Sequence, residues 1–497
     1  MPNLPHACVI GAGFAGLSAA SHLSKKGFRV TLIEKNDQAG GRARRFGSEG
    51  FTFDMGPSWY WMPDVFDHFF DSLDSSTQAH YQLKRLDPSY RIFFEGTETM
   101  DVPASMEELY ALFERYEKGS SEALKKFLKE SEYKYDVGIN DLVYKPSRSL
   151  LEFADTRVLK GLFKMDLFSS MSSYIRKHFN DSRLIRLLEF PVLFLGATAK
   201  KTPALYSLMN YADLCLGTWY PMGGMHKIVE GMVRVAEDRG VDIRLEEEVT
   251  GFSFAEDGRI ESILTSKGEI QADVVIGGAD YAHVDQQLLP KEKRNYSSDY
   301  WEKRKMAPSS LLFYLGVDQP IPGLLHHNLF FDEDFTQHAH EIYDEPQWPE
   351  RPLFYASCPS KTDPTVAPEG KENLFLLIPV APGLEDNDAT REHYYNLVMD
   401  RLEARTGMDV RSSVIYKRSY AHREFMEDYH AFKGNAYGLA NTLDQTALLK
   451  PSLKSKKVKN LYFTGQLTTP GPGVPPSLIS GEVVSNEIAK EFNPQLQ

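Results

Sequence analysis

Three glycines near the N-terminus have the spacing of a phosphate-binding turn. Gly11, Gly13 and Gly16 form the pattern G-x-G-x-x-G, directly after the apolar run of residues 7–10. The first glycine of such a pattern makes a tight turn, the second lets the backbone approach a pyrophosphate, and the third lets a helix pack closely on a strand. Glu34 closes the next apolar run, where a carboxylate can bind a ribose hydroxyl. The residues expected at this dinucleotide site are Gly11, Ala12, Gly13, Phe14, Ala15, Gly16, Glu34 and Lys35.

The elements around these residues are those that a dinucleotide site requires. Residues 7–10 and 30–33 are apolar runs of strand length, and the segment from Phe14 to Lys26 is predicted to form the helix between them. The N-terminus of that helix would point backbone N–H groups at the phosphates. A glycine turn can also do no more than join a strand to a helix, but the strand, the helix and the spaced acid occur here together.

A second group of glycines and cations follows Glu34. The run Gly40-Gly41-Arg42-Ala43-Arg44 precedes another glycine turn in residues 53–58. Glycines allow the backbone to approach a ligand closely, and arginines can bind phosphate or carboxylate bidentately. The alternative is a solvated pair of arginines in an ordinary loop. The residues expected to bind the ligand here are Gly40, Gly41, Arg42, Gly56, Pro57 and Ser58.

The C-terminal segment repeats the order of strand, glycine turn and helix. Residues 460–465 are typical of a buried strand that ends at a glycine, and residues 471–477 lead into a helix from about Leu478 to Glu491. Backbone N–H groups at such a turn and helix N-terminus can stabilise electron density on a ligand. A purely structural strand and helix is the alternative, and the N-terminal pattern weighs against it. The residues expected at the site are Gly465, Gly473, Val474 and Pro475.

Between these ends the chain changes character several times. A helical, charged segment starts at Ser105 with a capping-box pattern and continues to about residue 180. Residues 241–280 are again typical of a dinucleotide fold, and residues 281–420 predict a mainly antiparallel sheet with a helix near residues 391–406. The expected units are 1–100, 211–280 and 436–497 for the dinucleotide fold, 101–210 for a helical lid or membrane-associated region, and 281–435 for a substrate domain.

Composition limits the class of protein. The chain has 497 residues and a net charge of -13, which argues against a nucleic-acid partner because neutralising phosphates needs a basic face. Its three cysteines are far apart and fit neither a disulfide framework nor a paired-cysteine metal site, so no metal is expected. We find no signal peptide and no run of about 18 apolar residues, so we expect a cytoplasmic protein that contacts membranes peripherally.

The run from Gly40 to Arg44, together with the N-terminal fingerprint, resembles the flavin-containing amine oxidase and phytoene desaturase superfamily. The tail narrows the resemblance, because residues 461–465, 470–475 and 480–481 are similar to the signature of bacterial-type phytoene desaturases. The resemblance implies FAD and an α/β fold, in which a Rossmann-like, glutathione-reductase-like FAD domain is joined to a mixed α+β substrate domain and a helical lid. It also implies that Val249 holds the adenine, and Ala279 is the remaining residue expected at the FAD site.

The implied activity is desaturation of an acyclic C40 carotene, phytoene toward lycopene, by hydride transfer to flavin. The alternatives are a 1'-hydroxycarotenoid 3,4-desaturase, an amine oxidase or carotene isomerase, and a flavin-free prenyl-lipid carrier. The tail weighs against the amine oxidase and the isomerase, and the intact glycines with Glu34 and Arg42 argue that flavin binds. Oxygen or a quinone is the expected electron acceptor, since neither a second fingerprint nor a C-x-x-C motif is present.

The substrate end is less well defined by individual residues. Aromatic clusters at residues 59–61, 190–194 and 330–331 suit an apolar tunnel for a carotenoid, although aromatics are more often plain core. The amphipathic, basic-flanked segment from Val158 to Phe179 is predicted either to lie at a membrane interface or to form a lid helix. No general base is assigned, because the polar residues considered have no diagnostic spacing. These residues are His226, Asp213, His326 and His327.

Overall fold

The computed structural model describes residues 4–146 and 169–492 of the chain. A five-stranded parallel sheet has the strand order β19-β13-β1-β2-β9. Its strands are β1 (His6–Ile10), β2 (Arg29–Ile33), β9 (Asp242–Arg244), β13 (Val274–Gly277) and β19 (Leu461–Phe463). The apolar runs of the sequence suit its central strands because a parallel sheet is covered on both faces.

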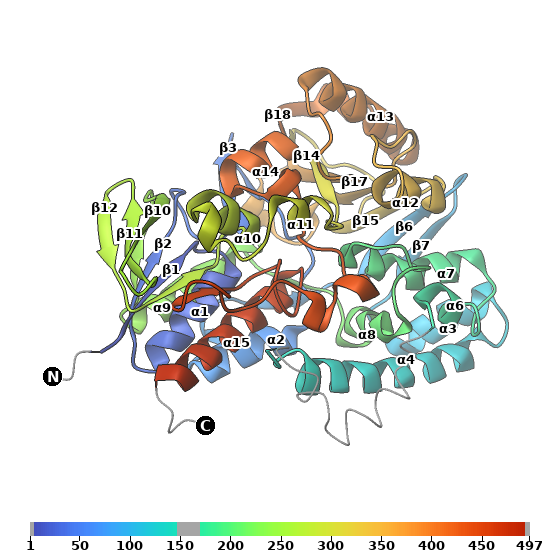
Figure 1. Ribbon diagram of the computed structural model, residues 1–497. Helices are drawn as coiled ribbons and strands as arrows, with labels where there is room; N and C mark the ends of the chain where they lie inside the picture. The colour runs from blue at the N-terminus through green and yellow to red at the C-terminus, as the bar shows by residue number, and fades with distance from the viewer. Residues whose placement is uncertain (1–3, 147–168, 493–497) are drawn as a thin grey trace.

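Helices α1 (Phe14–Lys25) and α15 (Val474–Phe492) lie side by side against one face of this sheet (Figure 1). They pack so closely that a Cβ on Gly481 would lie 2.5 Å from the carbonyl oxygen of Ala15. Helix α15 begins earlier than the predicted start at Leu478, because prolines are tolerated in the first turn of a helix, where the N–H groups have no helical partner. The two ends of the sequence therefore meet beside the N-terminal glycine turn.

A small antiparallel sheet packs on the parallel sheet. It consists of β10 (Val249–Phe254), β11 (Ile260–Thr265) and β12 (Gly268–Gln271). Cys8 and Val275 of the parallel sheet share a hydrophobic cluster with Val249 and Ile263 of the small sheet. This packing places the start of β10 near the carboxyl ends of β1 and β2, where dinucleotides bind in such folds.

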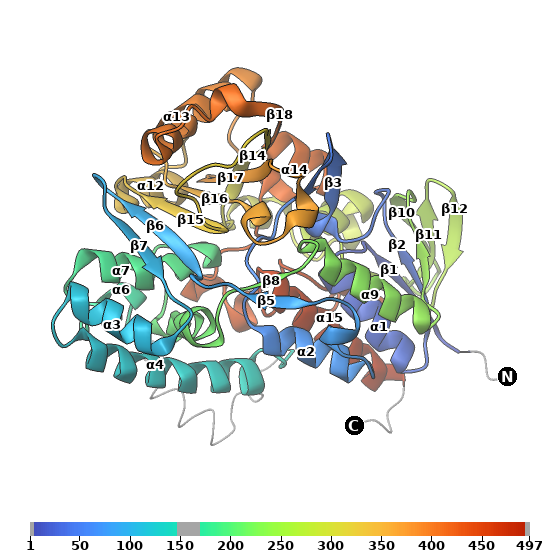
Figure 2. The ribbon, with the colours of Figure 1, turned by 180° about the vertical axis from the view of Figure 1, so that it is seen from behind.

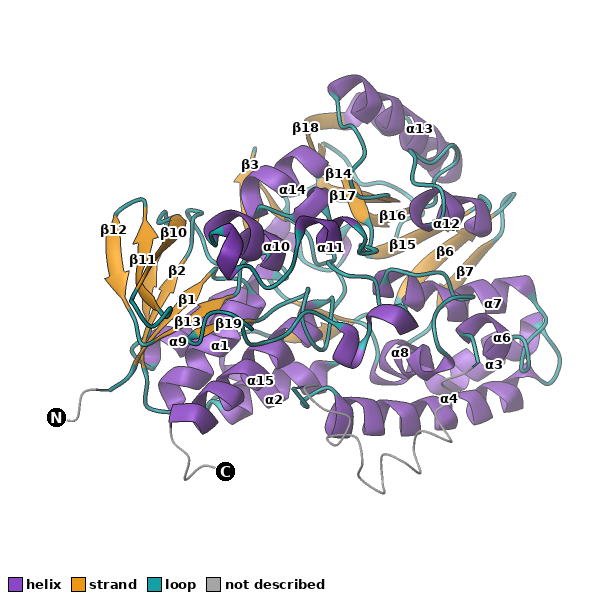
Figure 3. Ribbon diagram, viewed as in Figure 1, coloured by secondary structure: helices purple, strands orange, loops and turns teal. Residues whose placement is uncertain are grey.

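The second large layer is a mixed seven-stranded sheet with the order β18-β14-β17-β16-β15-β6-β7 (Figures 1 and 3). Its strands are β6 (Tyr90–Phe94), β7 (Thr99–Val102), β14 (Ser309–Val317), β15 (His327–Phe331), β16 (Phe354–Ser357), β17 (Glu372–Val380) and β18 (Val414–Tyr420). Helix α13 (Asp388–Thr406) packs on one face of this sheet, where Val398 and Leu402 share a hydrophobic cluster with Leu311 and Phe313 of β14. Helix α12 (Phe335–Tyr343) follows β15, and the rings of Phe335 and Phe331 lie 5.8 Å apart.

Strands β6 and β7 differ from the expected division of the chain. Strand β6 and the start of β7 fall in the segment 1–100 that we assigned to the dinucleotide fold, but the two strands form the edge of the seven-stranded sheet (Figure 2). Residues 91–94 pair in parallel with residues 328–331, and the rings of Phe93 and Phe330 stack at 4.6 Å. The pairing is between segments far apart in the sequence, so the local pattern did not reveal it.

A helical layer lies beneath β6 and β7. It contains α3 (Met106–Tyr116), α4 (Ser120–Asp136), α6 (Met171–Ile175), α7 (Ser182–Glu189) and α8 (Leu208–Tyr211). The predicted amphipathic segment from Val158 to Phe179 lies partly outside the described residues, and in its described part Met171 and Ile175 are fully buried. Within residues 4–146 and 169–492, no helix combines the length and the apolar character that crossing a membrane requires.

The remaining elements connect the two large sheets. The hairpin of β3 (Arg45–Ser48) and β4 (Phe51–Asp54) follows the second glycine group, and β5 (Leu83–Arg85) pairs with β8 (Trp219–Pro221). The helices are α2 (Pro63–Ser72), α9 (His226–Asp238), α10 (Tyr281–His283), α11 (Ser298–Glu302) and α14 (His422–Tyr429).

Candidate cofactor and substrate site

A cavity of about 440 Å³ extends from the glycine turns to the seven-stranded sheet. The residues predicted from the two ends of the sequence line it together with Val249 and Ala279, although they are separated by up to more than 400 positions. The predicted residues that line it are Gly11, Gly13, Phe14, Ala15, Glu34, Lys35, Gly40, Gly41, Arg42, Gly56, Pro57, Ser58, Val249, Ala279, Gly465, Gly473, Val474 and Pro475.

The two other predicted residues, Ala12 and Gly16, do not line the cavity but shape its wall. The Ala12 amide donates to Glu34 Oε2 at 2.8 Å. A Cβ on Gly16 would lie 1.9 Å from the carbonyl oxygen of Gly11, so only glycine fits where α1 approaches the turn. These contacts hold the turn in place from behind.

Gly11 and Gly13 both line the cavity, but glycine is needed at the two positions for different physical reasons. Gly11 has a φ of +96°, a conformation that residues with a side chain rarely adopt. Gly13 has an ordinary extended backbone, yet a Cβ there would meet nothing within 4 Å. Open space beside Gly13 is where the turn leaves room for a ligand to approach the backbone.

Glu34 is held rigidly at the end of β2. Its side chain is buried, Oε2 accepts from the Ala12 amide, and Oε1 accepts from the backbone N–H and the side-chain amide of Asn36 at 3.0 and 2.8 Å. Each carboxylate oxygen can accept more than one hydrogen bond, so the group can still receive ribose hydroxyls. The geometry fits the role that the spacing predicts.

Arg42 brings a positive charge to the cavity without a carboxylate at ion-pair distance among the described residues. Its Nη2 donates to the Asn435 carbonyl at 3.2 Å, and its buried Nε has no hydrogen-bond partner within the described part of the chain. Burial lowers the pKa of Arg42, opposed by the more distant charge of Asp280. A guanidinium in this state suits an anionic ligand such as a pyrophosphate.

Arg44, in contrast, is already paired. Its Nη2 donates to Asp428 Oδ2 at 2.5 Å and to the hydroxyl of Tyr429 at 3.4 Å. The cavity-facing cation of the predicted pair is therefore Arg42. The glycine cradle, the fixed Glu34 and the Arg42 guanidinium, which has no carboxylate at ion-pair distance among the described residues, fit the adenosine and diphosphate parts of FAD.

The other half of the cavity is apolar. Leu312, Leu329, Phe331 and Leu377 line it from the seven-stranded sheet, and Phe335, Ala339 and Ile342 line it from α12. Trp59, Trp61 and Phe190 add an aromatic wall. Of the predicted aromatic clusters, these residues and Phe331 reach the cavity, whereas Tyr60 and Phe330 belong to the buried core.

The aromatic wall is fixed by contacts behind it. The rings of Trp59 and His327 stack at 4.2 Å with an interplanar angle of 12°. Trp61 Nε1 donates to Thr218 Oγ1 at 2.8 Å, and Thr218 in turn contacts the carboxyl group of Asp213. These contacts hold flat apolar surfaces against the cavity.

None of the four polar residues considered as a base lines the cavity. His226 Nδ1 lies 2.8 Å from the Ala43 carbonyl, His326 Nδ1 lies 2.8 Å from Thr362 Oγ1, and His327 Nδ1 lies 2.6 Å from the Tyr355 hydroxyl. Asp213 accepts from the Tyr90 hydroxyl at 2.7 Å. All four are structural groups in this fold.

The sequence did not indicate several residues that line the cavity. His338, on α12, lies in the apolar half, where burial lowers its pKa to about 4. Its Nε2 donates to the Pro379 carbonyl and its Nδ1 accepts from the Leu353 amide, so both ring nitrogens are occupied. At the opposite end, His283 and the C-terminal turn of α14, residues 428–430, line the cavity and carry no local motif.

Together, a glycine-lined dinucleotide site and an adjoining apolar cavity define an oxidoreductase whose cofactor faces an apolar substrate. Residues 14–489 match the family described as flavin containing amine oxidoreductase. A carotenoid 3,4-desaturase from Haloarcula japonica is 42% identical over 97% of this chain and 98% of its own, and a phytoene desaturase from Fusarium fujikuroi is 31% identical over 97% and 89%. A solved oxidoreductase from Methanosarcina mazei, 17% identical, has the same fold with a TM-score of 0.62 over 96% of this chain and 99% of that one.

The chain belongs to the flavin containing amine oxidoreductase family, within its carotenoid desaturase branch. Its cofactor is FAD, and it is an oxidoreductase that acts on CH-CH groups. The predicted fold class, a Rossmann-like FAD domain joined to a mixed substrate domain, is confirmed.

Proposed function

We propose that the chain introduces C=C bonds into an acyclic C40 carotenoid with FAD as the hydride acceptor. The observation that carries this proposal is the continuity of the cavity from the glycine turns to the apolar wall. A long hydrocarbon could enter the apolar half and reach the same space that the cofactor-binding residues line. The relatives named as carotenoid and phytoene desaturases support this substrate class.

Bound FAD would supply the acceptor for a hydride removed from a saturated carbon next to the polyene. The chain contributes position and exclusion of water: Trp59, Trp61 and Phe190 form a flat apolar wall that can align a polyene. His338 cannot accept the second hydrogen as a proton, since both of its nitrogens are in hydrogen bonds. We propose that the residues of the glycine turns, with Glu34 and Arg42, bind the cofactor, and we assign no residue to proton transfer.

Two substrates are candidates within this class. Phytoene, converted toward lycopene, is the first. A 1'-hydroxycarotenoid desaturated at the 3,4 bond is the second. The higher identity to the Haloarcula relative, 42% against 31% for the Fusarium one, supports desaturation at the 3,4 bond. Ser310, Tyr343 and Tyr437 line the cavity, and each carries a hydroxyl group, the kind of group that can bind a substrate hydroxyl.

The decisive experiment supplies phytoene and a 1'-hydroxycarotenoid in separate liposome preparations with FAD and the purified protein, and follows products by chromatography and visible absorbance. New conjugated double bonds in one substrate identify it. No product from either, with flavin bound to the protein, would overturn the proposal. A protein that stays colourless after FAD addition would instead favour the flavin-free carrier.

We also propose that the protein takes up its substrate at a lipid surface. We further propose that oxygen or a quinone reoxidises the reduced flavin. The apolar substrate class supports the first part, because carotenoids reside in membranes. Flotation with liposomes tests membrane contact. Anaerobic assays with and without an added quinone distinguish the two acceptors: turnover that continues without both would exclude them.

A further inference from the structure

Helix α14 joins the substrate sheet to the cofactor end of the cavity. It follows β18 of the seven-stranded sheet, and its C-terminal turn reaches the loop after β2 of the parallel sheet. Phe425, Asp428, Tyr429 and the following His430 all line the cavity. None of them belongs to a glycine turn, so their presence at this end needs a separate explanation.

The first set of contacts is between the end of α14 and the residues next to Glu34. Lys35 Nζ donates to the Glu427 carbonyl at 2.6 Å, and the Asn36 side-chain amide donates to the Asp428 carbonyl at 3.2 Å. The last carbonyls of a helix lack helical partners and carry partial negative charge, so a lysine and an amide stabilise them. The helix end is therefore fastened beside the expected ribose position.

The second set involves the arginines of the glycine-rich run. Asp428 accepts from Arg44 at 2.5 Å and from the Tyr420 hydroxyl at 2.8 Å. The ring of Tyr429 lies under both Arg42 and Arg44, with each guanidinium carbon 5.2 Å from the ring centroid. The helix thus orients Arg42, the cation expected to face the diphosphate.

The third set closes the cavity at His430. Its ring stacks on that of His283 at 3.9 Å with an interplanar angle of 8°. Its Nε2 lies 2.9 Å from Glu248 Oε1 and 3.3 Å from Lys35 Nζ. Since Glu248 precedes Val249 and Lys35 follows β2, four segments meet here: the loop after β2, the start of β10, helix α10 and the end of α14.

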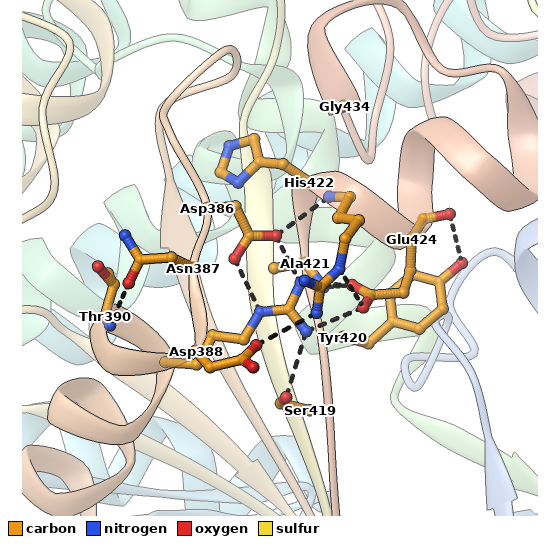
Figure 4. Close-up of polar contacts among 12 residues, drawn as sticks. Asp386, Asn387, Asp388, Thr390, Ser419, Tyr420, Ala421, His422, Glu424 and Gly434 are labelled. Atoms are coloured by element: carbon orange, nitrogen blue, oxygen red, sulfur yellow. Dashed lines mark hydrogen bonds and ion pairs between the residues drawn. The ribbon is translucent and has the colours of Figure 1, made fainter.

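The opposite end of α14 is anchored by a buried ion-pair group (Figure 4). Arg391 of α13 donates to both oxygens of Asp386 at 2.7 and 2.5 Å and to both oxygens of Glu424 at 2.9 and 2.6 Å. Glu424 Oε2 also accepts from the Ala421 amide at 2.8 Å, which caps the first turn of α14. The side chains of Arg391 and Asp386 are only 5% and 4% exposed, so the pairs are little screened.

We propose that α14 is a latch that retains FAD by closing the adenosine end of its site, with His430 and Tyr429 as cofactor-retaining residues and Arg391 as a positioning residue. This inference rests on the proposed placement of the cofactor along the glycine turns. Retention of FAD then depends on the seven-stranded sheet as well, because α13 and β18, which hold α14 in place, belong to that layer.

The test measures FAD retention rather than turnover. Holoprotein is diluted into buffer without FAD, release is followed by the rise in flavin fluorescence, and the Kd is measured on apoprotein. We expect His430→Ala and Arg391→Met each to raise the Kd and the release rate by about tenfold or more, because the closed end is opened without removing a glycine turn. His430→Gln, which keeps a polar side chain of similar reach, should restore part of the loss.

Arg401→Met is the matched control for Arg391→Met. Arg401 lies on the same helix, and its partly buried ion pair is with Asp332, away from α14. Both variants should lower the thermal midpoint of the apoprotein, but only Arg391→Met should weaken FAD binding. Equal effects of the two on the Kd, or wild-type FAD retention in His430→Ala, would overturn the latch. A wild-type protein that binds no FAD would refute the cofactor assignment itself.

Discussion

Gly16 lies so close to Gly11 that a Cβ on Gly16 would be 1.9 Å from the carbonyl oxygen of Gly11. Gly13, between them, has the opposite environment: a Cβ there would find no atom within 4 Å among the described residues other than its neighbours along the chain. The third glycine of the turn is therefore required by the fold, whereas the second leaves space for a ligand. Substitutions at Gly16 and Gly13 therefore test the stability of the fold and the affinity for FAD separately.

Gly13→Ala should fold normally and lose FAD. Its backbone is extended and the methyl group clashes with no protein atom, so the thermal midpoint of the apoprotein should match the wild type. The methyl group would occupy the approach to the diphosphate, and we expect the Kd for FAD to rise by about tenfold or more. Gly16→Ala should instead destabilise the apoprotein by several kcal/mol, about 3 or more, because the backbone must move.

Gly47→Ala, in β3, is the control for the first variant. Its added methyl would make only an ordinary contact, 3.5 Å from the Phe51 carbonyl, and Gly47 does not line the cavity. It should keep both stability and FAD affinity. If Gly13→Ala bound FAD as tightly as Gly47→Ala does, the diphosphate could not lie beside Gly13.

Arg42→Met should raise the stability of the apoprotein and lower its affinity for FAD. The guanidinium has a buried Nε without a partner, so the empty protein carries the cost of a desolvated charge. Replacing it with a methionine should stabilise the apoprotein by about 1 kcal/mol and weaken FAD binding by about tenfold or more. Urea unfolding of the apoprotein and flavin fluorescence titration measure the two quantities. A variant that loses apoprotein stability and keeps FAD affinity would contradict the assigned role.

The parts of the site that could be predicted are those in which the residue types and their spacing within a short segment indicate what the segment binds. Gly11 to Gly16 and Glu34 are such a case, since each residue answers a requirement of the turn or the ribose. The contacts of α14 could not be predicted in this way. Lys35 binds a backbone carbonyl 392 positions away, and because every residue has a backbone carbonyl, no residue type marks the partner. Likewise, β6 has an ordinary strand pattern, and only its pairing with β15 shows which sheet it joins.

Asp213 should make stability fall as the pH rises toward neutrality. Burial raises its pKa to about 7 from 3.8, against the hydrogen bonds from Tyr90 and Thr218. The folded state then holds a proton that the unfolded state has released, so the free energy of unfolding decreases between about pH 4 and 7. In Asp213→Asn this decrease should be smaller, with a difference from wild type of about 1–3 kcal/mol between pH 5 and 8.

Urea unfolding at several pH values checks the Asp213 prediction. Asn retains a carbonyl oxygen that can accept from the Tyr90 hydroxyl, so the wall around Trp61 should stay in place and tryptophan fluorescence of the folded state should be unchanged. Parallel stability curves for the two proteins from pH 5 to 8 would show that Asp213 does not titrate in this range.

Lys450 should destabilise the folded protein at neutral pH. Lys450 is 6% exposed, and its buried amine has no hydrogen-bond partner among the described residues. The amine packs against Gly471, where a Cβ would lie 3.1 Å from Nζ. Burial lowers its pKa from 10.5 to about 7, so the unfolded state binds more protons between these values and stability rises with pH across this window. Lys450→Met should be more stable than wild type at pH 7 by about 1–3 kcal/mol, and the difference should shrink toward pH 10.

Lys457→Met, at an exposed position with a single carbonyl contact, is the control and should leave the pH profile unchanged. A methionine variant less stable than wild type at pH 7 would mean that the charged amine is favourable where it lies, and would refute this account.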